Sequence, residues 1–185
     1  LDVQDRSSVL NGKLFGKAGP YERIIGRARF AIDPNSAANL PIADIALAPK
    51  NKSGLVEFAA DVYILKPLDA KKGNGTVLYE VSNRGAKGLL AAFHRAGNLD
   101  PRKPEEFGDA FLLEQGYTLM WLGWQFDMPE TPGLVRLYPP VVEGVKGIVR
   151  AEWIVDQRTD RQSVADRGHK PYVVSNPEDP ALQLT

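Results

Sequence analysis

The sequence predicts a mixed α/β fold that is rich in β-strands. Gly (17) and Pro (14) are frequent and spread along the 185 residues, which favours short strands and turns over long helices. Several short runs are rich in β-branched and aromatic residues, as strands are. Two apolar runs, residues 76–81 and 117–126, enclose segments with helical spacing. Two interior strands joined in this way should lie parallel, as a βαβ unit.

Composition excludes several classes of function. Lys plus Arg and Asp plus Glu number 23 each, so the chain offers no electrostatic footprint for nucleic acid or an anionic membrane. It has no cysteine, which removes disulfides, zinc–thiolate sites and thiol nucleophiles. No apolar run approaches the ~20 residues of a membrane helix. With two histidines and no metal-binding motif, no metal and no cofactor is expected.

The N-terminal part predicts antiparallel strands after an arm over residues 1–20. Residues 21–32 form the first strand and end at an Asp-Pro-Asn turn signal. Residues 42–47, closed by Pro49, are predicted as a second short strand, and residues 56–67 as a third.

The central part, residues 21–127, predicts two crossover helices. Residues 76–81 are short, apolar and bounded by glycine, as an interior strand is. Leu89, Leu90 and Phe93 then have helical spacing, with Gly97 placed to end that helix. Residues 103–117 predict one further helix, because Pro104 and two glutamates suit its first turn and an apolar stripe follows.

The C-terminal part, residues 128–185, is predicted as a proline-rich extension with an antiparallel strand over residues 147–157. It contains Ser163 near Asp166 and His169. Proximity along the chain does not define a catalytic triad, and the sequence has no G-x-S-x-G motif. We therefore interpret this segment as a polar loop.

The turn Ser82-Asn83-Arg84-Gly85 is the first candidate site. Ser82 or Asn83 can cap the following helix, and the N–H groups near Arg84 and Gly85 would be free donors for a phosphate, a carboxylate or an oxyanion. The alternative is a capped turn in which Arg84 is solvated or paired with a carboxylate.

The end of the strand over residues 117–126 is the second candidate site. Trp124 and Gln125 lie at its C-terminal end, where open α/β sheets bind their ligands. The alternative is that the indoles belong to the core, which is our prediction for Trp121.

Taken in order, "YERIIGRARFAIDP", "IADIALAPKNKSGLVEFAADVYILKP", "TVLYEVSNRG" and "FGDAFLLEQGYTLMWLGWQFD" resemble the N-terminal part of a family of large bacterial α/β-hydrolase-domain proteins. The resemblance covers roughly residues 21–127. Its most specific elements are "NRG" and "GWQ", each at the end of a strand.

The resemblance implies a serine hydrolase acting on esters, often exported, which the absence of an initial Met would fit. Asn83, Arg84 and Gly85 then correspond to the oxyanion side of the site. The nucleophile of that family lies further along than Thr185, so we expect an N-terminal portion that is not catalytic alone.

Two other functions stay open. One is a self-contained domain that binds a small anionic or aromatic ligand at Arg84, Trp124 and Gln125. The other is a structural module, which associates with itself or with the remainder of a longer protein.

Overall fold

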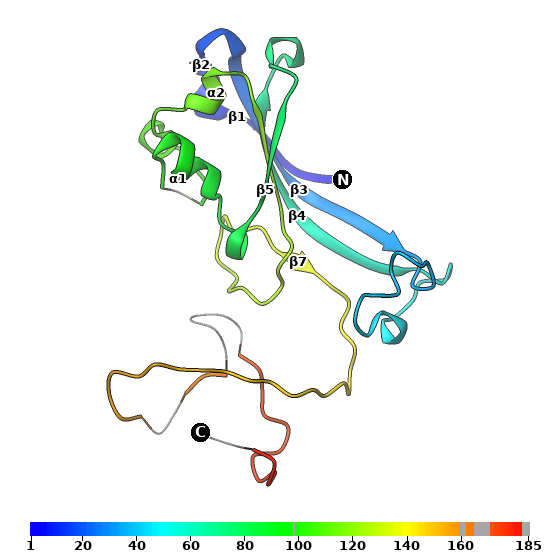
Figure 1. Cartoon of the computed structure of the whole chain (residues 1–185). Coiled ribbons are helices and arrows are strands. Elements are labelled where there is room, and N and C mark those ends of the chain that lie inside the picture. The colour runs from blue at the N-terminus through cyan, green and yellow to red at the C-terminus, as the bar shows by residue number, and fades with distance from the viewer. Residues whose placement is uncertain (98, 160–161, 165–170, 183–185) are drawn as a thin grey trace.

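The structure, a computed structural model, describes residues 1–97, 99–159, 162–164 and 171–182. It is a mixed sheet of seven strands that is mostly antiparallel, with one parallel pair (Figure 1). The strand order is β1-β3-β4-β6-β5, with β2 paired to β3 and β7 to β4. The strands are β1 Asp2–Ser8, β2 Leu14–Phe15, β3 Gly19–Ile32, β4 Val56–Pro67, β5 Val77–Val81, β6 Thr118–Leu122 and β7 Leu137–Tyr138.

The antiparallel start of the sheet is confirmed. β3 pairs with β4 without interruption from Tyr21 opposite Pro67 to Ile32 opposite Val56. Near the end of this hairpin the Phe30 and Phe58 rings stack with centroids 4.9 Å apart. The predicted strands over residues 21–32 and 56–67 are thus correct, because both runs are long and rich in residues that fit a pleated surface.

The first twenty residues, predicted as an arm, contribute strands of their own. β1 pairs antiparallel with β3, with a register shift between Val3 and Asp5. β2 also pairs with β3. The polar character of β1 suits an edge of the sheet, which explains why its sequence does not look like a strand.

The strand predicted over residues 42–47 is wrong. These residues form turns and a 3₁₀ helix, Ile45–Leu47. Asp44, which precedes it, has a left-handed φ of 58°. Ile45 is the buried residue of this helix, in a small cluster with Ala48 and Val56. The turn buries the Ile45 side chain without pairing its backbone to the sheet. A strand here would place alternate residues of an apolar run in solvent.

β5 and β6 form the predicted parallel pair. The connection between them holds the 3₁₀ helices η5 Asn83–Gly85 and η6 Pro104–Phe107 and the helices α1 Gly88–His94 and α2 Phe111–Glu114. The prediction that residues 76–81 are an interior strand is wrong, since β5 is the edge of the sheet. An apolar run of this length has the same pattern in either place, and only its neighbours distinguish them.

The single helix predicted over residues 103–117 is also wrong. It is divided into η6 and α2 at Gly108 and Ala110, which have positive φ angles of 58° and 55°. A Cβ on Gly108 would lie 1.7 Å from the His94 carbonyl oxygen, so the chain must pass here without a side chain. α1 ends at His94, where Arg95 with φ 54° takes the role predicted for Gly97.

The strand predicted over residues 147–157 is wrong as well. These residues form no strand, and Ile148 and Ile154 are 103% and 100% exposed. The antiparallel pairing after residue 127 is instead made by β7, opposite Ala59 and Ala60 of β4. The prediction depended only on the alternation of apolar and polar residues. In the structure no apolar surface packs against the apolar side chains Ile148 and Ile154.

The main core lies between the helices and one face of the sheet. Figure 1 shows α1 and α2 on the same side of the sheet. The side chains buried there come from β3, β4 and β6 and from the helices: Tyr21, Tyr63, Leu65, Leu119, Trp121, Leu90, Phe107, Leu112 and Leu113. Trp121 is fully buried, as predicted.

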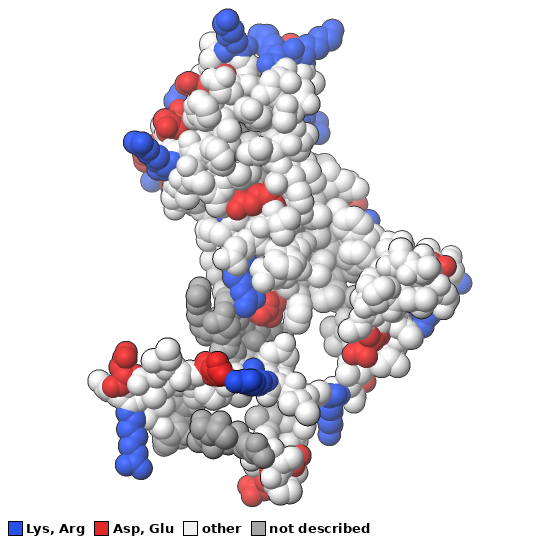
Figure 2. All heavy atoms as spheres, in the orientation of Figure 1, with Lys and Arg blue, Asp and Glu red and all other residues white. Residues whose placement is uncertain are grey.

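Charges of both signs are interspersed over the face in view (Figure 2). Within the described part of the chain, no helix is sufficiently long and apolar to cross a membrane.

Candidate functional site

The turn after β5 and the segment after β6 lie against each other at the C-terminal edge of the parallel pair. The backbone N–H of Arg84 donates a hydrogen bond to Oε1 of Gln125, at 2.8 Å. The indole Nε1 of Trp124 donates to the carbonyl oxygen of Ser82, at 2.5 Å. The structure therefore brings together the residues that the sequence placed at two separate strand ends.

The Arg84 side chain extends the same contact. Its guanidinium lies 2.6 Å from Oδ1 of Asp127, and both side chains are about one-quarter exposed (26% and 28%). Arg84 itself has a left-handed φ of 54° and Gly85 a φ of 73°. Asn83 is exposed. The turn is thus tied by its backbone and by the Arg84 side chain to residues 125–127.

The turn does not cap a helix, contrary to the sequence-based expectation. α1 begins only at Gly88 with Lys87 as its N-cap, and the Ser82 hydroxyl is buried without a partner. The Ala86 N–H donates to the Asn83 carbonyl at 3.3 Å. The left-handed φ of Arg84, inside η5, explains the difference, because it prevents η5 from continuing as a regular helix into α1.

Residues 128–136 close over this turn. The Gly85 carbonyl accepts a hydrogen bond from the Val135 N–H at 3.0 Å. A Cβ on Gly85 would lie 2.6 Å from the Val135 carbonyl oxygen and 3.0 Å from the Met128 methyl group. Only glycine fits here, both for its positive φ and for this close approach.

A buried lysine lies next to the turn. Lys87 is only 4% exposed. Its Nζ donates to the carbonyl oxygens of Leu99 and Gly133, the latter at 2.5 Å, and lies 4.1 Å from the centroid of the Tyr63 ring. Burial lowers the pKa of Lys87 to about 8, while nearby carboxylates of Asp100 and Glu80 partly oppose this shift.

Asp100, whose carboxylate acts on Lys87 electrostatically, is bound to side chains of the sheet. It accepts a hydrogen bond from the Tyr63 hydroxyl at 3.1 Å and pairs with Arg23 at 3.6 Å and Arg102 at 2.6 Å. Burial is the main reason that the pKa of Tyr63 is raised, with the Asp100 carboxylate adding to it. At neutral pH Tyr63 is therefore a neutral hydrogen-bond donor.

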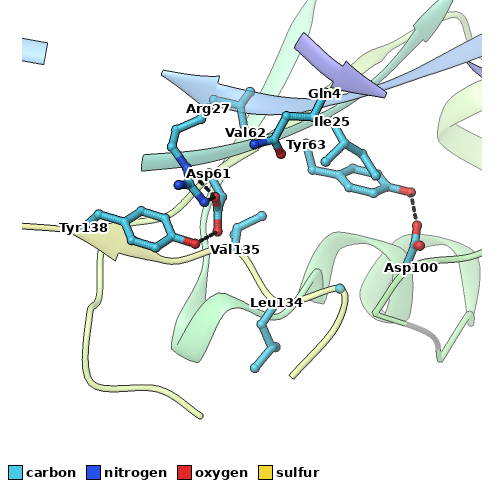
Figure 3. A pocket seen from close by; sticks show the side chains of 11 residues that line it. Gln4, Ile25, Arg27, Asp61, Val62, Tyr63, Asp100, Leu134, Val135 and Tyr138 are labelled. Carbon is cyan, nitrogen blue, oxygen red and sulfur yellow. Dashed lines mark hydrogen bonds and ion pairs between the residues drawn. The ribbon is translucent and has the colours of Figure 1, made fainter. Parts of the chain in front are cut away.

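A cavity of about 250 Å³ lies beside these groups (Figure 3). Tyr63 and Asp100 stand at one end and Asp61 at the other. Asp61 accepts from Arg27 at 3.1 Å, from the Tyr138 hydroxyl at 3.0 Å and from the Arg136 N–H at 3.2 Å. The polar groups of the wall thus pair with one another and join β4 to β7.

Of the Ser163 loop, the structure describes residues 162–164. Asp166 and His169 lie outside the described residues, and the Ser163 carbonyl accepts from the Trp153 indole at 2.9 Å. His94 has a packing role, since it is fully buried and its Nε2 accepts from the Leu112 N–H at 3.0 Å. Among the residues that the structure describes, no group of three or more His, Asp and Glu could hold a metal ion.

Sequence reasoning missed Glu80, Lys87 and Asp100. Glu80 Oε2 accepts from the Trp121 indole at 2.5 Å and from the Leu89 N–H at 2.9 Å. The sequence contained a signal for Glu80, because it is the only charged residue of the apolar strand β5 and a charge in such a strand needs a partner. Nothing in the sequence distinguishes Lys87 from a solvated lysine.

Comparison of the chain with known families, curated proteins and solved structures finds no match to any of them. The structure therefore defines the fold class of the described residues: a β-rich mixed α/β fold, whose sheet has a single parallel pair of strands.

Proposed function

We propose that this chain is the N-terminal portion of a serine α/β-hydrolase that acts on esters. It supplies the first strands of the sheet and the loop on the oxyanion side of the site, formed by Asn83, Arg84 and Gly85. One observation carries the proposal: the Arg84 N–H is held by Gln125 at the C-terminal edge of the parallel pair, 2.8 Å from its Oε1. This edge is where α/β sheets place their reacting groups.

In this proposal Gln125 is a positioning residue. Its amide oxygen occupies the place that a developing oxyanion would take beside the Arg84 N–H, so it holds this donor until substrate displaces it. A charged oxyanion would form a stronger hydrogen bond with this donor than the neutral amide oxygen does, and this offsets the loss of the Gln125 contact. The Arg84–Asp127 ion pair and the indole of Trp124 hold the two segments together.

The chain alone is not expected to catalyse. A donor for the oxyanion accelerates nothing without a nucleophile, and Ser82, the first residue of the turn, is buried with an unpartnered hydroxyl. Purified residues 1–185 should neither hydrolyse a chromogenic short-chain ester nor react with a fluorophosphonate. Ester turnover that is abolished by Ser163→Ala would overturn this expectation.

The positive test uses the coding sequence beyond codon 185. We expect it to encode a glycine-flanked serine, and the longer polypeptide to bind fluorophosphonate at that serine. In the longer enzyme, Gln125→Ala should lower kcat for a short ester, because the Arg84 N–H loses the acceptor that positions it. Asn51→Ala, on the turn between β3 and β4, should leave kcat unchanged. A reading frame without such a serine contradicts the proposal.

A second function, binding of a small anionic or aromatic ligand, is favoured by Trp124. Trp124 is 50% exposed although its Nε1 is held by the Ser82 carbonyl, so an oriented indole is accessible to solvent. Benzoate combines both ligand properties. A quench of tryptophan fluorescence by benzoate that is lost in Trp124→Phe and kept in Trp153→Phe would support this function, and no saturable quench would exclude benzoate-like ligands.

A further inference from the structure

A groove with a volume of about 430 Å³ lies on the β1 side of the sheet. It is lined by the end of β1, by η1 Val9–Gly12, by Arg23 of β3 and by residues between 101 and 107. Arg23 is opposite Leu65 of β4, which in turn is opposite Leu119 near the beginning of β6. The groove is therefore separate from the candidate site, which follows the end of β6, and from β5, at the other edge of the sheet.

The charged side chains that line this groove are all cationic. Among the described residues they are Arg23, Arg102 and Lys103, although acids and bases are equal in number in the whole chain, at 23 each. The carboxylates next to these cations do not line the groove: Asp5, Asp100 and Glu106. An anion that entered the groove would thus meet positive groups before negative ones.

The guanidinium of Arg23 is not fully paired. This residue is buried, at 6% exposed, and its Nη2 donates to Asp5 at 2.8 Å and to Ser7 at 2.6 Å. Its Nη1 lies 3.6 Å from Asp100, which is too long for a hydrogen bond, and its Nε is buried without a partner. A buried cation with unpaired donors is costly. An oxygen acceptor in the groove would give Nη1 the hydrogen bond that Asp100 does not.

Three further polar groups of the wall are available to a ligand. Within the described part of the chain, the Lys103 ammonium pairs with no carboxylate, and the Ser8 hydroxyl and the Asn11 side-chain amide make no hydrogen bond. All three side chains are exposed. They add unused donors to that of Arg23 in the same groove.

The backbone of η1 is strained where it lines the groove. Leu10 and Asn11 have consecutive left-handed φ angles of 46° and 53°, which a residue with a Cβ rarely adopts. Such strain is concentrated at binding and catalytic sites. It therefore supports a binding function for this groove.

The remaining wall of the groove is apolar. Val9, Leu10, Pro101 and Phe107 line it, and Val9 and Phe107 belong to the main core. A few charged donors on an apolar wall are typical of sites for small molecules, and about 430 Å³ is a suitable volume. An inorganic anion would leave this wall uncovered, whereas an organic acid would cover it with its hydrocarbon part.

We propose that this groove binds a small organic acid with a single carboxylate. The carboxylate contacts Arg23, Arg102 and Lys103, and the hydrocarbon part packs on Val9 and Phe107. The planar guanidinium groups match the two oxygens of a carboxylate. A dianion such as a phosphate monoester fits less well, because the three acids of the chain that lie next to these cations would repel it more strongly.

Hexanoate tests the proposal, because it joins one carboxylate to a short apolar chain. Titration calorimetry should find saturable binding at millimolar concentration, and the Nε–H signals of Arg23 and Arg102 in the ¹⁵N-labelled chain should shift along the same saturation curve. Hexanol lacks the charge and sulfate lacks the hydrocarbon, so both should bind more weakly. No saturable binding of hexanoate, or equal affinity for hexanol or sulfate, would overturn the proposal. Tighter binding of hexyl phosphate would overturn the assignment to a carboxylate.

Arg102→Gln tests the place of binding, since Arg102 is exposed and its replacement leaves the core intact. It should raise the Kd of hexanoate about ten-fold, because one charged donor is lost. Arg29→Gln is the matched control: Arg29 is also an exposed arginine paired with an aspartate, Asp2, but it does not line the groove. Its Kd should be unchanged.

An equal Kd in Arg102→Gln and Arg29→Gln would contradict the proposed place of binding. Trp124→Phe should bind hexanoate as the unmodified chain does, which separates this groove from the candidate site. None of these measurements involves ester hydrolysis, so their outcome is independent of the proposed hydrolase function.

Discussion

Gly85 and Val135 are in direct backbone contact: the Gly85 carbonyl accepts from the Val135 N–H at 3.0 Å, and a Cβ on Gly85 would stand 2.6 Å from the Val135 carbonyl oxygen. The contact holds the turn after β5 against residues 128–136. Gly85 therefore fixes the geometry of the candidate site although it contributes no side chain.

The first prediction is that Gly85→Ala lowers the free energy of unfolding by about 3 kcal/mol, from backbone strain together with the clash. Gly54→Ala is the control, because Gly54 has a similar φ of 78° but nothing within 4 Å of its Cβ position. It should cost only the strain, about 1–2 kcal/mol. Urea unfolding measures both, and equal costs would contradict the contact.

The second prediction concerns the hydrogen bond between the buried Trp121 and the half-buried Glu80. Trp121→Phe removes the donor to the carboxylate and leaves a void in the core. The expected loss of unfolding free energy is about 2–4 kcal/mol.

Trp153→Phe, on the partly exposed loop after β7, is the control and should change the unfolding free energy by less than about 0.5 kcal/mol. Chemical denaturation followed by circular dichroism separates the two. A loss in Trp121→Phe as small as that of the control would argue against the hydrogen bond between the Trp121 indole and Glu80.

The strands β3, β4, β5 and β6 and the burial of Trp121 could be predicted from the sequence, whereas β1, β2, β7 and the connections could not. β3 and β4 are long and contain both β-branched and aromatic residues, so local preference and tertiary environment agree there. The predictions for residues 42–47 and 103–117 are wrong because tertiary packing, and not the local sequence, determines the secondary structure of these segments. Gly108 is the example, because its role depends on the backbone of His94, which is distant in sequence.

The candidate site could be predicted only in part, for the same reason. Arg84, Trp124 and Gln125 were identified from their places at strand ends, since a parallel pair brings those ends together. The bonds that they make among themselves, and the cluster of Lys87, Tyr63 and Asp100 behind them, depend on the return of residues 128–136. No local pattern encodes that return.

The third prediction concerns acid stability and His94. Burial lowers the pKa of His94 below its usual 6.5, so the unfolded chain binds a proton at a pH where the folded chain does not. The stability that neutral His94 contributes is present above pH 6.5 and is lost as pH falls through the folded pKa.

His94→Gln keeps an acceptor for the Leu112 N–H and removes the titration. The fall in unfolding free energy from pH 7 to pH 5.5 should be smaller in this variant than in the unmodified chain. Denaturation at several pH values measures the difference. His169 is common to both proteins and cancels, so identical pH profiles would contradict the prediction.

The last prediction concerns alkaline stability and Lys87. Its folded pKa is about 8, against 10.5 without burial. Between these values the unfolded chain carries the proton and the folded chain does not, so the unfolding free energy should rise with pH. The rise per pH unit approaches about 1.4 kcal/mol.

Lys87→Met retains the length of the side chain and removes the titrating group. The increase in unfolding free energy between pH 8 and pH 9.5 should be present in the unmodified chain and absent in Lys87→Met. Lys66→Met is the control, because Lys66 lies on β4 at the surface with a salt bridge to Glu22. If Lys87→Met kept the rise, the ammonium group would not be buried as the contacts with Leu99 and Gly133 require.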